Sequence, residues 1–157
     1  MANHLGHLLY VSAALPATNN DTGFEALTWT LVNGVQQLPQ LGFNHSMIEV
    51  GDLASGVETA EKGAGRGADT TIMCREITAD AGQVILRAQG DDDDGLISVK
   101  LAKPTGAGGT LATGDVVQYA QGLAHSLVDN QGNLTSYEGF QIGFRQNAKT
   151  VTDTEPA

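Results

Sequence analysis

The stretch formed by residues 51–68 constrains the fold of this chain more than any other segment. It contains five glycines, no aromatic residue and the scattered charges Asp52, Glu58, Glu61, Lys62 and Arg66. Such a segment buries too little apolar surface to offset the roughly 1 to 2 kcal/mol per residue lost when a backbone is ordered. Because long loops in small domains are usually functional or disordered, we expect this one to become ordered against something outside its own subunit.

Two strand-like runs flank this stretch, at residues 43–50 and 69–77. Their composition and the glycine-rich segment between them predict an extended hairpin, in which the two runs pair and the long loop forms the tip.

The rest of the sequence predicts a mainly β fold with antiparallel sheets and one short flanking helix. Apolar and polar residues alternate from Ile97 to Leu101, which indicates a half-buried strand, and two long antiparallel strands are expected within residues 117–127 and 140–145. The spacing becomes helical after Asp80, where Gln83 would complete a capping box and Gly90 would end the helix. Within residues 27–38, Asn-Gly indicates a hairpin or a kinked strand.

The chain length fits a single domain spanning residues 1–157. With 5% aromatic residues and 20 glycines, the composition favours sheets with many turns. Residues 1–7 are expected to form an N-terminal arm, and the polar residues 147–157 a C-terminal tail that is mobile or docks elsewhere.

The net charge of −10 argues against binding nucleic acid through neutralised phosphates. It does not exclude DNA as a neighbour, since a wall that lets DNA pass should repel phosphate. Acidity can also serve solubility alone.

Cys74 is the only cysteine, so an intrachain disulfide and a cysteine-based zinc cluster are excluded. The N-terminal sequence resembles no signal peptide and no segment is apolar enough to span a membrane, so we expect a protein kept in the cytosol or carried out in a larger particle.

Motifs for a metal or cofactor are weak. Asp91 to Asp94 fail the calcium-loop pattern at both ends, and the glycines of residues 63–67 are not followed by a helix, as phosphate-binding loops require. We therefore expect no metal, no cofactor and no catalytic site. A cryptic histidine–carboxylate site around His125 and Asp129 is the enzymatic alternative.

The order of elements is distinctive: a short N-terminal strand, a segment with Thr28 and Trp29, a hairpin with a long tip, the helix segment 80–88 and a final meander. From about Leu8 to Arg145 this order resembles the tail tube (major tail) proteins of long, flexible-tailed bacteriophages. The resemblance implies a β-sandwich or β-barrel subunit, six of which form a ring, with rings stacked into a tube that conducts double-stranded DNA.

The resemblance also implies partners and a location. The expected partners are further copies of the chain, a tape measure protein, and tail terminator or distal tail proteins, in a virion tail assembled in the host cytoplasm. The hairpin loop and both terminal arms would contact neighbouring subunits, with Asp52, Glu58, Glu61, Lys62 and Arg66 as contact residues. A ring-forming tail terminator or distal adaptor is the nearest alternative, and a secreted adhesive β-sandwich is a further one.

Overall fold

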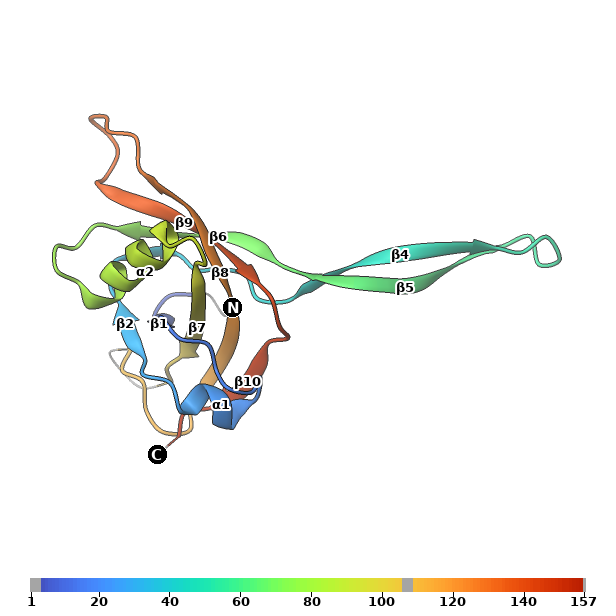
Figure 1. Cartoon of the computed structure of the whole chain (residues 1–157), viewed down its shortest axis with the longest axis horizontal. Coiled ribbons are helices and arrows are strands. Elements are labelled where there is room, and N and C mark those ends of the chain that lie inside the picture. Colours follow the sequence, from blue (N-terminus) through green and yellow to red (C-terminus); the bar gives the residue numbers. More distant parts are fainter. Residues whose placement is uncertain (1–3, 106–108, 157) are drawn as a thin grey trace.

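The computed structural model describes residues 4–105 and 109–156 and shows a mainly β protein (Figure 1). One antiparallel sheet has eight strands, a separate hairpin has two, and two short helices lie beside them; the large sheet does not close into a barrel. The elements are β1 (Leu8–Ser12), α1 (Asp21–Glu25), β2 (Thr30–Val32), β3 (Val35–Gln37), β4 (Phe43–Gly51), β5 (Glu58–Gly67), β6 (Asp69–Arg75), α2 (Ala81–Asp91), β7 (Leu96–Lys103), β8 (Val116–Asp129), β9 (Gly139–Gln146) and β10 (Val151–Thr154).

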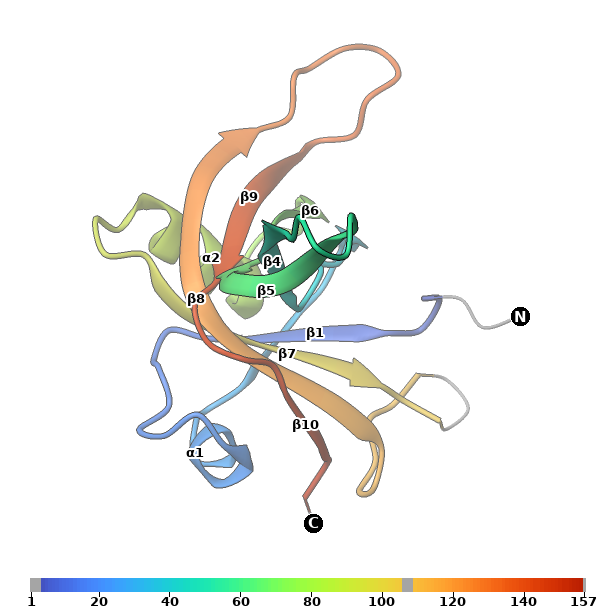
Figure 2. The ribbon, with the colours of Figure 1, turned by 90° about the vertical axis from the view of Figure 1, so that its right-hand side faces the viewer.

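The sheet follows the order β2-β1-β7-β8-β9-β6-β3, and β10 pairs with β8 beside this path. The long strand β8 curves strongly (Figure 2), and this curvature lets it serve two neighbours on one edge. Its first residues pair with β10 and its later residues with β9, while β7 runs along the other edge. The two long C-terminal strands expected from the sequence are therefore confirmed as a pair.

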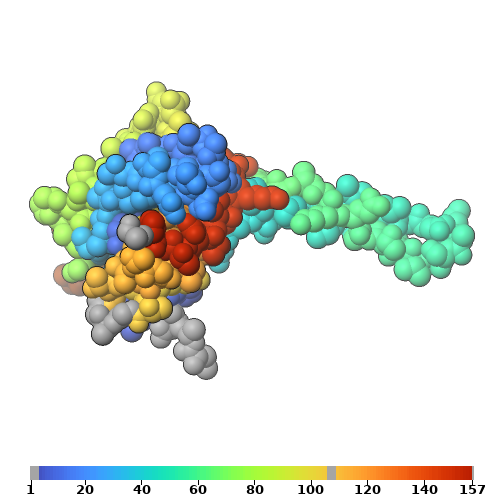
Figure 3. Space-filling view, turned by 90° about the horizontal axis from the view of Figure 1, so that it is seen from below, coloured from blue at the N-terminus to red at the C-terminus, as the bar shows by residue number. Residues whose placement is uncertain are grey.

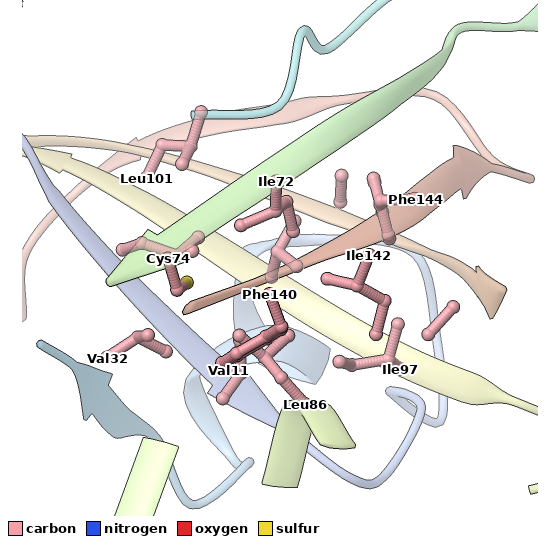
Figure 4. Close-up of a cluster of buried hydrophobic side chains, with 14 residues drawn as sticks. Val11, Val32, Ile72, Cys74, Leu86, Ile97, Leu101, Phe140, Ile142 and Phe144 are labelled. Carbon is pink, nitrogen blue, oxygen red and sulfur yellow. The ribbon is translucent and has the colours of Figure 1, made fainter. Parts of the chain in front are cut away.

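The main core lies between the sheet and α2 (Figure 4). Leu86 of α2 is fully buried against apolar side chains from six strands. These side chains are Leu9, Val11, Val32, Ile72, Cys74, Ile97, Val99, Leu101, Ala120, Ala124, Phe140, Ile142 and Phe144.

A second, smaller core covers the other face of the sheet beside α1. Phe24 of α1 stacks on Tyr119 of β8 with ring centroids 5.1 Å apart, and Trp29 lies over the same ring at 5.6 Å. Strand β7 is consequently buried on both faces, with Lys100 and Ala102 facing this second core. The expectation of a half-buried strand was wrong, because α1 and the apolar side chains beside it cover the second face and no pattern in the sequence had indicated them.

The helix expected after Asp80 is confirmed as α2. Asp80 is its N-cap and accepts a hydrogen bond from the backbone N–H of Gln83 at 3.1 Å. Gly90 lies within the helix, which continues to Asp91. The Gln83 side chain does not complete a capping box; it accepts from the Ile77 N–H and donates to the carbonyl of Asn33 at 2.6 Å.

The Asn33-Gly34 dipeptide does not form a hairpin. β2 and β3 lie on either side of it in sequence but occupy opposite edges of the large sheet. The connection is held by α2 instead, because the Asp80 carboxylate accepts from both the backbone and the side chain of Asn33. Gly34 has a φ of 77°, and a Cβ there would come within 2.6 Å of the Arg75 carbonyl oxygen.

The expected pairing of residues 43–50 with 69–77 was wrong, as was the 18-residue loop. Residues 43–51 pair with 58–67, from Phe43 opposite Gly67 to Gly51 opposite Glu58, which leaves only residues 52–57 at the tip. β6 lies in the large sheet between β9 and β3. The inward-facing backbone groups of β4 and β5 bond to each other and the outward-facing ones can bond to water, so low apolar content did not prevent strand formation.

The C-terminal segment is part of the large sheet. β10 pairs with β8, and the carboxylate of Glu155 lies 2.7 Å from the Lys100 ammonium. The free edge of β8 beyond the end of β9 accommodates residues 151–154, so this part of the expected tail is a strand of the sheet. Of the expected N-terminal arm, residues 1–3 lie outside the described residues, and His4 to Gly6 form a turn before β1.

Candidate interaction surface

The hairpin of β4 and β5, here called the arm, projects from the body as a separate ribbon (Figures 1 and 3). All residues from 46 to 62 are exposed. Five large apolar side chains are among them: Met47, Ile48, Val50, Leu53 and Val57. Exposed apolar side chains concentrated on one projecting element are typical of an interaction surface.

The tip of the arm, residues 52–58, has a defined conformation. The Asp52 carboxylate accepts from the backbone N–H of Ala54 at 2.9 Å, and the Asp52 carbonyl accepts from Gly56 at 2.9 Å. Gly56 adopts a φ of 64°, which glycine tolerates best. Leu53 and Val57 are left pointing into solvent, with Leu53 fully exposed.

The five charged residues expected as contacts all lie on the arm but are not brought into one cluster. Asp52 is at the tip, whereas Glu58, Glu61, Lys62 and Arg66 are spread along β5 as far as the last pairs before the body. Among the described residues, no ion pair involves them. Asp52 has a structural role within its own chain, which its position in the sequence did not reveal.

The root of the arm is fixed by Gln146, a residue that the sequence analysis missed. Its buried side chain accepts from the Gly42 N–H at 2.8 Å and donates to the Ala148 carbonyl and the Thr150 hydroxyl, both at 2.7 Å. A Cβ on Gly67 would come within 1.7 Å of the Gln146 carbonyl oxygen. A buried glutamine at a strand end leaves no periodic signal in sequence.

An open groove of about 1060 Å³ lies beside the arm root. This root groove is bounded by the N-terminal turn, by the chain from β3 into β4, and by the ends of β7 and β8. Its lining residues are His4, Leu5, Gly6, His7, Val35, Gln36, Gln37, Leu38, Pro39, Gln40, Leu41, Gly42, Phe43, Asn44, Ala68, Leu101, Lys103 and Gln118.

The groove carries basic groups at one side. The Nδ1 atoms of His4 and His7 are 3.2 Å apart, and their rings meet edge to face. The pKa of His7 lies below its usual value because of burial, with further contributions from His4 and from the charge of Lys103. His7 is therefore largely neutral at neutral pH.

The enzymatic alternative finds a different geometry from the one expected. Nε2 of His125 lies 2.7 Å from the Asp69 carboxylate, and Nδ1 lies 2.8 Å from the Ser126 hydroxyl. Asp129 instead pairs with Arg87 at 3.1 Å. The His125 and Asp69 side chains are 41% and 47% exposed, so water reaches both, and the root groove does not include them.

The other residues considered for a metal site or for catalysis do not form a site. No cluster of three or more histidine, cysteine or acidic side chains suited to a metal is found in residues 4–105 and 109–156. Asp91 to Asp94 are exposed where α2 ends. Cys74 is buried, and burial raises the pKa of its thiol to about 12. Within the described part of the chain, the helices are too short and too polar to cross a bilayer.

Comparison of the chain with protein-family models and with curated protein sequences finds no match to either.

Proposed function

We propose that this protein is a structural subunit that assembles with copies of itself into hexameric rings, stacked as the tail tube of a long-tailed bacteriophage. The observation that supports this most strongly is the arm, an exposed, ordered hairpin with apolar side chains that its own subunit does not cover. A subunit with such an arm gains stability when the arm is covered by a neighbour.

The open sheet supports the same proposal. In the described part of the chain, β2 pairs only with β1, β3 only with β6, and the arm pairs only within itself. Unpaired edges invite other strands, and closing them against identical neighbours in a ring removes the aggregation hazard. The net charge of −10 suits a channel that DNA crosses without sticking. In this role the subunit catalyses no reaction and needs no cofactor.

The proposal is tested by negative-stain microscopy and sedimentation of the purified protein over a range of concentrations. We expect rings that stack into tubes of varying length. Single closed rings at every concentration would favour the terminator or adaptor alternative, since those proteins do not propagate. Monomers at every concentration would contradict the proposal.

The arm itself is tested by replacing residues 46–63 with a two-residue Asn-Gly turn. This change removes exposed residues only, apart from the half-covered Gly63, so the body should keep its circular dichroism spectrum. We expect the shortened protein to remain monomeric under conditions in which the full chain assembles, and normal tubes would contradict a role for the arm.

A further inference from the structure

We propose that the tip of the arm of one copy docks into the root groove of a second copy. This inference rests on the proposed self-assembly and adds the surface that receives the arm. Two features of the structure carry it, the charges of the two surfaces and their positions on the molecule.

The tip carries negative charge, and the described lining of the root groove carries the positive charge of Lys103. The tip, residues 52–58, carries the carboxylates of Asp52 and Glu58 and no lysine or arginine, whereas Lys62 and Arg66 lie further along β5. The described lining of the root groove contains His4, His7 and Lys103 and no acidic residue. Acidic residues outnumber basic ones 18 to 8 in the whole chain, so a groove of this size without a carboxylate is a distinct surface. Complementary charge favours the encounter and sets its orientation.

The apolar parts also match. Leu53 and Val57 project from the tip without cover. The groove offers the partly buried side chains of Leu38 and Leu41, which pack against the main core beside the already buried Leu101. Docking would remove both sets of apolar surface from water, with the charged groups placed around them as a polar rim.

The positions of the two surfaces require the contact to be between copies. The groove lies at the root of the arm and includes Phe43 and Asn44, whereas the tip is nine residues of β4 away. At about 3.4 Å per residue this is roughly 30 Å, and Figure 1 shows the arm extending away from the body. When the tip of one copy fills the groove of another, the pair still has one free tip and one free groove. Such a head-to-tail contact can repeat, and it forms either closed rings or open stacks.

Docking would also take up protons. Carboxylates of the tip would face His4 and His7, and the only other charged group on the described groove lining is Lys103. In the free subunit His7 binds a proton more weakly than an ordinary histidine. A nearby carboxylate strengthens that binding, so the association constant should rise as pH falls from 8 to 6.

Disulfide trapping tests the contact directly. Leu53→Cys in one full-length preparation is mixed with Gln40→Cys in another, since both side chains are exposed and Cys74 is buried. Under mild oxidation we expect a cross-linked heterodimer at least tenfold more abundant than with Asp93→Cys, an exposed position outside the groove. Assembly without this cross-link would overturn the inference but leave the proposed function standing. Absence of both assembly and cross-link would overturn both, and a cross-linked dimer that never extends would overturn the tube alone.

Charge exchange provides a second test. Glu58→Lys should weaken assembly at least tenfold, and Lys103→Glu in the same chain should restore it. Asp93→Lys makes the same change of charge on the body and should leave assembly unaffected. Equal effects of Glu58→Lys and Asp93→Lys, or no restoration by Lys103→Glu, would mean that the two surfaces do not meet.

Discussion

At the scale of single residues, the acidic excess of the chain places carboxylates in contact with each other. Glu25 at the end of α1 and Asp153 on β10 share a hydrogen bond, which raises the pKa of Glu25, and burial and the charge of Asp153 add to the shift. A carboxyl whose pKa is raised by folding stabilises the native state at low pH, and this contribution is lost as pH rises through the raised value. At neutral pH the pair is therefore a site of repulsion between α1 and the C-terminal strand.

Glu25→Gln should raise the melting temperature at pH 7, because the amide donates to Asp153 without adding a charge. The advantage over the native chain should shrink as pH falls through the raised pKa, where Glu25 is itself protonated. Scanning calorimetry from pH 4 to pH 8 measures this difference. Glu58→Gln, on the exposed arm, is the control, and a stabilisation by Glu25→Gln that is the same at every pH would contradict the shared proton.

At the scale of elements, sequence patterns identified strands and the helix α2 more reliably than they identified which strands pair with each other. The spacing after Asp80 was sufficient to find α2, because a helix is held by contacts within the segment. Pairing depends on distant parts of the chain. Nothing near residues 69–75 indicated that β9 and not β4 is the neighbour of β6, and nothing near Asn33 indicated that β2 and β3 would lie at opposite edges of the sheet. α1, with its Asn20 cap, is only five residues long, too short to leave a helical spacing of apolar residues in the sequence.

The sequence predicted where the candidate surface lies, but not the contacts that hold it to the body. The sequence pointed to residues 51–68 as a segment without cover of its own, and residues 51–62 are indeed exposed on the arm, whereas Gly67 is buried at its root. It could not show the root, where Gly67 lies under the Gln146 backbone and the Gln146 side chain joins β9 to the start of the arm. A glycine needed for close approach and a glutamine needed for three hydrogen bonds are recognised only when the partners are in place.

Gly67→Ala should loosen the arm at its root. The added methyl group cannot fit 1.7 Å from the Gln146 carbonyl oxygen, so the backbone of β5 or β9 must move, at a cost of about 1 to 3 kcal/mol in the free energy of unfolding. Urea denaturation measures the cost, and hydrogen exchange should show faster exchange at Ala68 and Gln146, whose N–H groups bond across the root. Gly132→Ala, where nothing lies within 4 Å, should change neither, and an unchanged exchange rate in Gly67→Ala would mean that the root is not held in this way.

At the scale of the whole molecule, one ion pair links the C-terminal segment to the second core. Lys100 of β7 is buried, with its ammonium over the rings of Tyr10 at 4.8 Å and Trp29 at 6.0 Å, and its counter-charge is Glu155, just beyond β10. The last strand is thus held by its ladder with β8 and by a charge at its end. The pair lies beside the second core that α1 covers. Its loss should therefore loosen the packing on the face of the sheet opposite α2.

Glu155→Ala should destabilise the protein by about 3 kcal/mol, because it leaves the Lys100 ammonium buried without a partner. This is the low end of the cost for a buried pair, since the Glu155 side chain is 21% exposed. Trp29 is the only tryptophan, so its fluorescence should shift to the red at lower urea concentration than in the native chain. The double variant Lys100→Met with Glu155→Gln removes both charges and should recover most of the stability, while Glu138→Ala, an exposed residue, should have almost no effect. Equal losses in the single and double variants would show that the packing of β10, and not the unpaired ammonium, accounts for the change.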